Sequence, residues 1–488
     1  GVVEASHAGV PLVVCTADRP PRLHHVGAPQ TIEQTGLYRT AVRWSFDPGP
    51  IRDADRSWWR SLGARSVAEA VAGAGPVHLN LAFDEPLHGV AGPLPDGTIE
   101  GAAVRAGEAV AVAGVVEPEP WSRPGLIVAG GGAPDPDMVL ALADHLGWPL
   151  LADPRSRARV EHPSVVAAAD AILRDAAARE VLRPETVLLV GQPWTSRVLA
   201  EFIQTLGRSG THVVASGARV ADPGRVVGET HPSASGLVRS LLALAPSGRD
   251  DSWRGRWERV EAAAQGAIDK AIDNDPLAQG GRATEPSVAR HLYGALDAST
   301  ALFASSSMPV RELEWFAAPR SNPPRVLANR GANGIDGITS TALGVAAGAR
   351  RPVVALLGDL AFLHDVSALV SLRGEGRGSC TLVVLDNEGG GIFNFLPQAD
   401  SVGPDRFERL FGTPPAVSVS EVGRGFGLPV AEASTLPELD EGLAGFVGAP
   451  GCALIRVAVP SREANRALHE RVHAAVAEAV EGVLTSDS

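Results

Sequence analysis

The stretch that decides the fold is residues 352–397, PVVALLGDLAFLHDVSALVSLRGEGRGSCTLVVLDNEGGGIFNFLP. Its apolar run at 352–358 leads into Asp359, and a second apolar run at 380–386 leads into Asn387, which follows 387 − 359 = 28 residues later. Two short runs rich in β-branched residues, separated by a helix-like segment, predict parallel strands joined by a helix. Because the carboxyl ends of parallel strands form the usual ligand edge of a sheet, both polar residues are candidate site residues.

Three oxygen donors follow these strands. Asp359 offers a carboxylate, Asn387 an amide oxygen and Gly389 a main-chain carbonyl. These are hard ligands of the kind that Mg²⁺ takes together with phosphate oxygens. A helix that begins directly after a strand also favours a diphosphate bound by main-chain N–H groups. On these residues alone, one alternative stays open: Asp359 caps a helix and the glycines at 389–391 turn the chain.

A second glycine-rich stretch, VLANRGANGIDGITSTALGVAAG, occupies residues 326–348. A strand here leads into Arg330, and a loop of small residues follows, which lets the backbone approach a flat heterocycle closely. Ile335 is the bulky apolar residue of this loop, a candidate to support such a ring, with core packing as the alternative. Arg330 suits either a surface ion pair or a substrate carboxylate bound by two hydrogen bonds.

Composition excludes several classes of protein. Lys and Arg number 43 against 56 Asp and Glu, so 43 − 56 = −13, and no general nucleic-acid binder is expected. No apolar run approaches the length of a membrane span, so we predict no membrane partner and a cytoplasmic location. Cys15, Cys380 and Cys452 are widely spaced in apolar runs, which predicts reduced, buried core residues.

Short apolar runs alternate with helix-like segments along most of the 488 residues, which predicts an α/β protein of parallel sheets flanked by helices. Besides the two strands above, strands are predicted at 11–15, 77–83, 126–130, 186–191, 211–216, 325–329 and 452–459. Two stretches interrupt this alternation of strands and helices. One is rich in Pro and Gly, near 83–97, and the other is polar and charged, at about 249–285. The predicted parts are a partial first domain (1–88), a linker (89–123), a middle α/β domain (124–248), a helical connection (249–284) and a C-terminal domain (285–488).

Six motifs carry a resemblance to one family, and they span nearly the whole chain. They are TADRPPRLHHVGAPQTIEQ (16–34), GPVHLNLAFDEPL (75–87), PLLADPRS (149–156), NRGANGIDG (329–337), GDLAFLHD (358–365) and GGGIFNFLP (389–397). Together they resemble the 2-succinyl-5-enolpyruvyl-6-hydroxy-3-cyclohexene-1-carboxylate synthases, thiamine diphosphate enzymes of menaquinone biosynthesis. In thiamine diphosphate enzymes generally, the motif at this place reads Gly-Asp-Gly. Here Leu360 replaces the last glycine, as is common in this family.

The resemblance implies a three-domain thiamine diphosphate-enzyme fold whose first domain binds the pyrimidine and whose last binds the diphosphate. It implies thiamine diphosphate with Mg²⁺ or Mn²⁺ as cofactors and a homodimer or homotetramer. It also implies a transferase that decarboxylates 2-oxoglutarate and adds the succinyl carbanion equivalent to isochorismate.

The resemblance also implies roles for single residues. Arg19 and Gln30 match positions that contact isochorismate, Ser307 and Arg311 match the pair that holds the succinyl carboxylate, and Ser306 and Arg330 match further substrate contacts. Metal ligands are expected at Asp359, Asn387 and Gly389. Cofactor contacts are expected at Ile335, Gly358, Asp359, Leu360, Ala361, Asn387, Ile392, Phe393 and Leu396.

One component of the implied mechanism is missing from the residues given. The family's catalytic glutamate, which activates the cofactor, is expected upstream of Gly1, so we expect the first domain to be incomplete and this polypeptide alone to have little activity. Two alternatives stay open: another thiamine diphosphate enzyme, such as an acetolactate synthase or a 2-oxo acid decarboxylase, and a non-catalytic relative. A nicotinamide or flavin protein could be built on AGGGAP at 129–134, but that run lacks the GxGxxG spacing.

Overall fold

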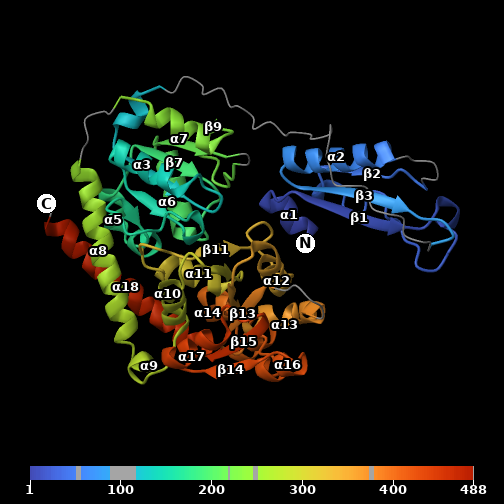
Figure 1. The fold of residues 1–488 in the computed structure, drawn as a ribbon. Helices are drawn as coiled ribbons and strands as arrows, with labels where there is room; N and C mark the ends of the chain where they lie inside the picture. Colours follow the sequence, from blue (N-terminus) through green and yellow to red (C-terminus); the bar gives the residue numbers. More distant parts are fainter. Residues whose placement is uncertain (51–55, 88–116, 218–219, 246–250, 373–377, 487–488) are drawn as a thin grey trace. The chain divides into compact units, whose positions relative to one another are not determined.

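A computed structural model describes residues 1–488 except 51–55, 88–116, 218–219, 246–250, 373–377 and 487–488 (Figure 1). The chain divides into two compact units, one of Gly1–Val110 with Asn329–Asn333 and one of Ala111–Ala328 with Gly334–Ser488. Most of the predicted linker at 89–123 lies outside the described residues.

The first unit holds a three-stranded parallel sheet in the order β1-β3-β2. Its strands are β1 (Leu12–Asp18), β2 (Trp44–Phe46) and β3 (Pro76–Ala82), and its helices are α1 (Val2–Ala8) and α2 (Arg56–Ala72). The central β3 is buried, whereas β1 lies at the edge of this sheet and is half exposed.

The prediction that Cys15 is a core residue is therefore wrong, because this cysteine lies on β1 and is exposed. Cys380 and Cys452 are buried as predicted, and all three cysteines are free.

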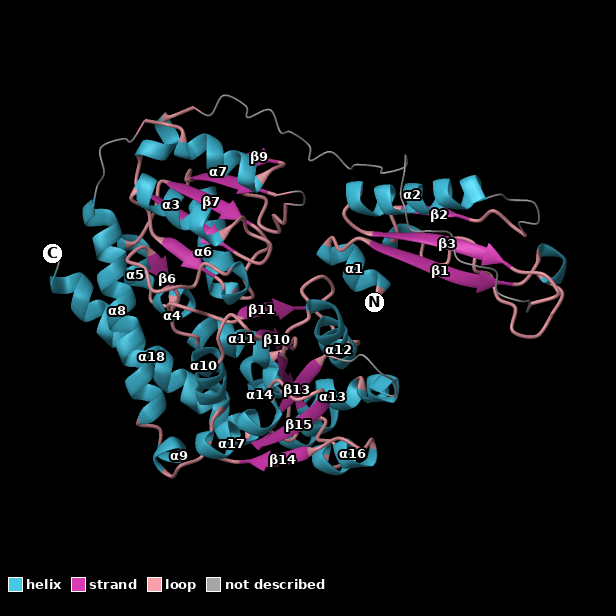
Figure 2. Cartoon of the chain, in the orientation of Figure 1, coloured by secondary structure: helices cyan, strands magenta, loops and turns pink. Residues whose placement is uncertain are grey.

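The second unit contains two six-stranded sheets in which all strand pairs are parallel (Figure 2). The first runs β6-β5-β4-β7-β8-β9, with β4 (Gly125–Ala129), β5 (Leu150–Ala152), β6 (Val165–Val166), β7 (Thr186–Val190), β8 (His212–Ser216) and β9 (Glu229–His231). Its helices are α3 (Pro136–Leu146), α4 (Ala169–Ile172), α5 (Ala176–Val181), α6 (Arg197–Arg208) and α7 (Ala234–Leu242). Alternate residues of β4 enter different core clusters on the two faces, which is why the strand is apolar throughout.

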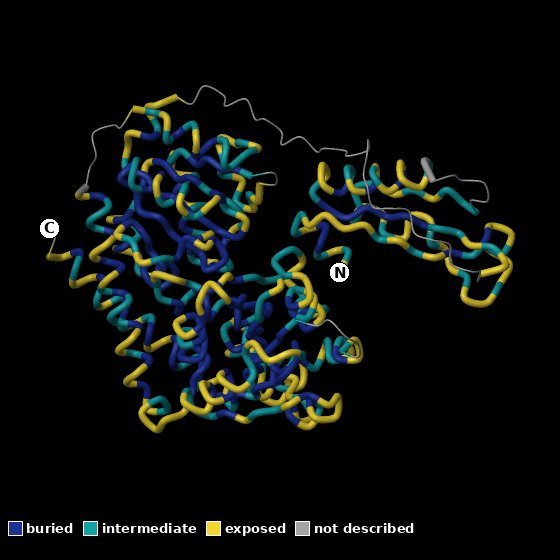
Figure 3. Tube along the Cα trace, viewed as in Figure 1, coloured by how far each residue is buried: buried dark blue, intermediate teal, exposed yellow. Residues whose placement is uncertain are grey.

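The second sheet runs β11-β10-β12-β13-β15-β14. Its strands are β10 (Ala301–Ala304), β11 (Arg325–Ala328), β12 (Val353–Gly358), β13 (Ser379–Asp386), β14 (Val430–Ala433) and β15 (Gly451–Ala458). Its helices are α10 (Glu285–Ala295), α11 (Met308–Phe316), α12 (Ile338–Ala349), α13 (Asp359–His364), α14 (Gln398–Ser401), α15 (Pro404–Phe407), α16 (Val419–Gly425) and α17 (Leu436–Phe446). The central strands are buried on both faces (Figure 3). The predicted parallel α/β architecture is confirmed, and a strand forms at each place the sequence indicated.

Two long helices, α8 (Asp251–Asp273) and α18 (Arg462–Ser486), run against each other beside these sheets, and the short α9 (Pro276–Gln279) follows α8 (Figure 1). Trp257 of α8 and Val472 of α18 enter one core cluster with residues of the first six-stranded sheet. Arg159 is fully buried and donates hydrogen bonds of 2.9 Å to the main-chain oxygens of Glu314 and Ala317, so the segment after β5 is joined to the end of α11 by a buried polar contact. Within the described residues, none of the helices combines the length and the apolar character that crossing a membrane requires.

Candidate active site

The candidate site lies at the carboxyl edge of the sheet that contains β12. The chain passes from β10 to β11 on one side and then to β12 on the other, so its direction of winding reverses at β10. In open parallel sheets, ligands bind at such a reversal, outside the carboxyl ends of the strands. Register pairs Ala304 with Leu356 and Gly358 with Leu385, so the segments after β10, β12 and β13 emerge at this edge.

Asp359 follows β12 directly and is 1% exposed. Its Oδ1 accepts a 2.7 Å hydrogen bond from the main-chain N–H of Leu360, and its Oδ2 accepts one of 2.7 Å from that of Gly389. Burial raises the pKa of Asp359 to about 7, the two main-chain bonds oppose this shift, and the charge of Asp386 adds to it. Such a carboxylate is stabilised by a cation bound beside it.

Asn387 follows β13 and has a well-defined orientation. Its Nδ2 donates a 2.7 Å hydrogen bond to Oε1 of Glu285, while its Oδ1 is buried without a hydrogen-bond partner in the described structure. Burial raises the pKa of Glu285 to about 8, and the charge of Glu312 acts in the same direction. A buried, unpaired amide oxygen beside a strand end fits a cation ligand, because buried polar atoms normally have partners.

The donor set fits a hard divalent cation. Among the described residues, no group of three or more His, Cys, Asp or Glu side chains is arranged to hold a metal. A cation at this edge would therefore depend on Asp359, Asn387 and a main-chain oxygen of the glycine loop, together with oxygens of its own ligand. This composition suits Mg²⁺ or Mn²⁺ better than Zn²⁺, which prefers nitrogen and sulfur.

Close packing explains the glycine loop after β13. Gly389 has φ +136°, and a Cβ there would lie 2.2 Å from the main-chain oxygen of Gly412. The N–H of Gly390 donates a 2.7 Å hydrogen bond to the same oxygen. Arg462 borders the loop, and its Nη2 donates a 2.6 Å hydrogen bond to Oε2 of Glu408. The loop is therefore fixed from two sides.

Most of the predicted cofactor contacts lie in this loop, in the segment after it or at the start of α13. Gly358 is the N-cap of α13 and supplies no side-chain cap. Leu360 and Ala361 form the first turn of that helix, and Ile335 lies half-buried shortly before α12. After the glycines, Ile392 and Phe393 are half-buried in a 3₁₀ segment (Gly391–Phe395) and Leu396, just past it, is 36% exposed. The partial exposure of these three side chains fits the wall of a site better than a closed core.

The segment after β10 carries the predicted carboxylate-binding pair. Ser306 is buried, and Ser307 adopts φ +73° at the N-cap of α11, a conformation uncommon for a residue with a Cβ. Nη1 of Arg311 donates a 2.6 Å hydrogen bond to the main-chain oxygen of Ser307. Burial lowers the pKa of Arg311, and the negative charges of Glu314 and Asp170 oppose that shift. The pair is thus brought together, with a half-buried guanidinium at the edge.

The other predicted substrate residues belong to the first unit. Arg19 directly follows β1, and its main-chain oxygen lies 2.8 Å from Nε2 of His24. Gln30 is exposed with φ +58°, and Arg330 lies in the Asn329–Asn333 segment. Their substrate roles remain predictions.

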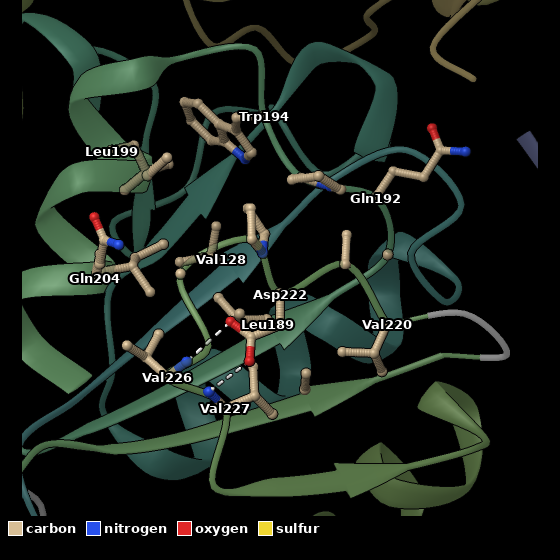
Figure 4. Close-up of a pocket in the computed structure, with 18 of the residues that line it drawn as sticks. Val128, Leu189, Gln192, Trp194, Leu199, Gln204, Val220, Asp222, Val226 and Val227 are labelled. Carbon is tan, nitrogen blue, oxygen red and sulfur yellow. Dashed lines mark hydrogen bonds between the residues drawn. The ribbon is translucent and has the colours of Figure 1, made fainter. Parts of the chain in front are cut away.

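A cavity of about 100 Å³ lies instead beside the first six-stranded sheet, between α6 and the segment before β9 (Figure 4). Its lining is mainly apolar and includes Trp194 and Leu199. Asp222 is drawn there accepting 3.0 Å hydrogen bonds from the N–H groups of Val226 and Val227. Gly130, directly after β4, has a packing role, because a Cβ there would lie 1.6 Å from the main-chain oxygen of Gln192. Packing thus accounts for the first glycine of the run on which the nicotinamide or flavin alternative depended.

Glu285 is the site residue that the sequence did not reveal. Its carboxylate contacts Asn387 across 102 residues of chain, and it stands at the first position of α10 behind a Thr284–Ser287 capping box. The pattern Thr-Glu-Pro-Ser signals a helix start, but nothing local links it to a strand end so far along the chain.

Comparisons with known proteins agree with this geometry. Residues 313–457 match the family described as thiamine pyrophosphate enzyme, C-terminal TPP binding domain, and residues 119–304 match the middle domain of thiamine pyrophosphate. The benzoylformate decarboxylase of Polynucleobacter necessarius superposes with a TM-score of 0.65 at 17% identity, over 94% of this chain and 84% of that one, which shows the shared fold.

Relatives in two bacteria show a closer kinship. The 2-succinyl-5-enolpyruvyl-6-hydroxy-3-cyclohexene-1-carboxylate synthase of Thermobifida fusca is 40% identical over 97% of this chain and 84% of its own length. The synthase of the same name in Myxococcus xanthus is 36% identical over 98% of this chain and 83% of its own length. Thiamine diphosphate, the pyrophosphate of the family description, is therefore the cofactor. The chain belongs to the 2-succinyl-5-enolpyruvyl-6-hydroxy-3-cyclohexene-1-carboxylate synthase family of thiamine diphosphate-dependent enzymes.

Proposed function

We propose that this enzyme decarboxylates 2-oxoglutarate and joins the remaining four carbons to isochorismate, a step of menaquinone biosynthesis. The product keeps its enolpyruvyl group, so no pyruvate is released. Thiamine diphosphate, when bound, supplies the electron sink that makes loss of CO₂ and carbon–carbon bond formation accessible. The chain's own residues bind, orient and shield the reactants.

The observation that carries the proposal is the unpaired Oδ1 of Asn387, which follows β13, while the buried carboxylate of Asp359 follows the paired strand β12. These two atoms and the main-chain oxygen of Gly389 would hold Mg²⁺ or Mn²⁺, which in turn binds the diphosphate. Gly358, Leu360 and Ala361 would lie against the diphosphate, and Ile335 would support the ring system. Ile392, Phe393 and Leu396 would form an apolar wall that excludes water from the reacting carbons.

Both proposed substrates are dicarboxylates, and arginine side chains would bind their negatively charged groups. Arg311, whose Nη1 is bonded to the main-chain oxygen of Ser307, would bind the distal carboxylate of 2-oxoglutarate, with Ser306 and Ser307 as hydroxyl donors. Arg19, Gln30 and Arg330 would bind isochorismate. Local arginines therefore offset a net charge of −13 for the chain as a whole. We further propose a cytoplasmic homodimer or homotetramer.

Product analysis tests the proposal against its nearest competitor. The protein is incubated with thiamine diphosphate and Mg²⁺, with either 2-oxoglutarate plus isochorismate or pyruvate alone, and products are identified by mass spectrometry. The proposal expects the six-membered-ring product only from the first mixture, with one CO₂ per product. Acetolactate from pyruvate, with isochorismate untouched, would instead identify an acetolactate synthase.

A further inference from the structure

We propose that Glu285 is a positioning residue that fixes the side-chain amide of Asn387, so that Oδ1 of the amide faces the cation and Nδ2 faces away. The inference rests on the proposed function in one respect, because it takes Asn387 as a ligand of Mg²⁺ or Mn²⁺. Neither the motifs nor the comparisons give Glu285 this role.

The geometry of the contact supports a fixed orientation. Nδ2 of Asn387 donates to Oε1 of Glu285 over 2.7 Å, and Glu285 is 2% exposed, so water does not compete freely for the carboxylate. The capping box holds Glu285 in place, because the N–H of Ser287 donates to Oγ1 of Thr284 over 3.2 Å and the N–H of Thr284 donates to Oγ of Ser287 over 2.8 Å. A rigid helix start therefore presents the carboxylate to Asn387.

The chemistry of the two groups selects one of two amide orientations. A primary amide has one accepting oxygen and one donating nitrogen, which differ little in shape, so an isolated asparagine can present either. In this contact Oε1 of Glu285 accepts the hydrogen bond, so it takes Nδ2 of the amide and turns Oδ1 to the opposite side. That oxygen is the buried, unpaired atom of the site. Without Glu285, the flipped amide would present N–H groups to a cation, which repels them.

Cation affinity is the direct readout, and it does not require turnover. Mn²⁺ binding in the presence of thiamine diphosphate is measured from the electron paramagnetic resonance signal of free Mn²⁺. Residues that orient metal ligands are typically worth about 10- to 100-fold in affinity, and we expect a loss of this size for Glu285→Ala. Glu285→Gln keeps an accepting oxygen but can also donate, so a loss of less than about 10-fold is expected.

A donor–acceptor exchange separates positioning from a general structural role. In Asn387→Asp two carboxylates face each other, and Mn²⁺ affinity falls. In the double variant Glu285→Gln/Asn387→Asp the new amide donates to the new carboxylate, so the hydrogen bond is restored in reverse and an oxygen still faces the cation. We expect this double variant to bind Mn²⁺ more tightly than Asn387→Asp alone.

Glu261→Gln is the matched control, because Glu261 is also a buried carboxylate, 7% exposed, and accepts a 3.0 Å hydrogen bond from the N–H of Ala168. This variant should leave Mn²⁺ affinity within about twofold, because the hydrogen bonds given for Glu261 go to Ala168 and Gln265 and not to a proposed metal ligand. Asn387→Ala tests the proposed ligand itself. If Asn387→Ala weakens Mn²⁺ binding but Glu285→Ala does not, or if the double variant binds no better than Asn387→Asp, positioning by Glu285 is overturned. If Asn387→Ala binds Mn²⁺ as tightly as the parent does, Asn387 is not a metal ligand, and it is this part of the proposed function that is contradicted. Should Glu285→Ala not fold, the double variant decides.

Discussion

The main-chain N–H of Gly389 donates a 2.7 Å hydrogen bond to Oδ2 of Asp359, which joins the segment after β13 to the residue that follows β12. The two halves of the proposed metal site are therefore not independent. A change in the glycine loop should move the carboxylate, and a change in the carboxylate should release the loop.

Gly389→Ala tests this connection from the loop. The glycine has φ +136°, and the new Cβ would lie 2.2 Å from the main-chain oxygen of Gly412, so the loop has to shift. Strained backbone of this kind costs about 1–3 kcal/mol, and we expect thiamine diphosphate affinity to fall at least about 10-fold. Isothermal titration with the cofactor and Mg²⁺ measures it. The control is Gly403→Ala, where nothing lies within 4 Å of the new Cβ, and equal affinities in both variants would refute the connection.

Asp359→Asn tests the same connection from the carboxylate. The variant keeps the shape but removes the charge at a site 1% exposed, so the cation loses its strongest ligand. We expect a loss of at least about 100-fold in kcat/KM, because the cofactor is no longer oriented. The exposed Asp405→Asn should keep the parent's kcat/KM. Parent-like kinetics in Asp359→Asn would remove the metal assignment.

Arg311→Met tests the proposed substrate carboxylate site. Hydrogen bonds to charged groups contribute about 1.5–3 kcal/mol, so the KM for 2-oxoglutarate should rise roughly 10- to 150-fold, with a smaller change in the KM for isochorismate. Initial rates with each substrate varied separately give both constants. Arg424→Met serves as the control, because that arginine is 54% exposed and pairs with Glu432 over 3.1 Å. A rise confined to isochorismate would reverse the assignment of the two substrates.

The stability of the protein in acid should depend on His469. This residue is 1% exposed, and its Nε2 lies 2.9 Å from Oε1 of Glu312. Burial lowers the pKa of His469 to about 3, and the charge of Arg174 acts in the same direction. As pH falls below the unfolded-state pKa of about 6.5, His469 takes up a proton in the unfolded chain but stays neutral in the folded one. The free energy of unfolding therefore falls by up to about 1.4 kcal/mol for each unit by which pH decreases.

Urea unfolding between pH 7 and pH 5 measures this dependence. Burial lowers the pKa of the neighbouring His473 to about 2, so that residue contributes a slope of the same sign. His469→Gln should therefore reduce the slope by up to about 1.4 kcal/mol per pH unit without abolishing it, whereas His364→Gln, with a side chain 51% exposed, should keep it. Burial also raises the pKa of Glu312, and that contribution falls as pH rises above about 4.5, so it opposes the histidine over the same window. An unchanged slope in His469→Gln would contradict the assignment of the acid sensitivity to this histidine.

The strands that position the site were predictable because they are long apolar runs ending in polar residues. β12 and β13 carry Asp359 and Asn387 where the sequence indicated. β10, with four residues, was missed, although the chain reverses its winding there. Short strands carry too little periodicity to be recognised.

Contacts between residues far apart in the sequence could not be predicted either. The bond between Asn387 and Glu285 joins residues 102 positions apart, and it depends on the packing of α10 beside the sheet. The exposure of Cys15 likewise follows from the edge position of β1, which an apolar run does not reveal. Local pattern therefore specified the strand ends, while tertiary packing specified which side chains support them.

The most direct test of the proposed reaction is the spectrophotometric loss of isochorismate catalysed by the full-length protein in the presence of 2-oxoglutarate, thiamine diphosphate and Mg²⁺. We predict a loss that requires all three additions and collapses in Asp359→Ala. Loss of isochorismate without 2-oxoglutarate, or at an unchanged rate in Asp359→Ala, would contradict the proposed reaction.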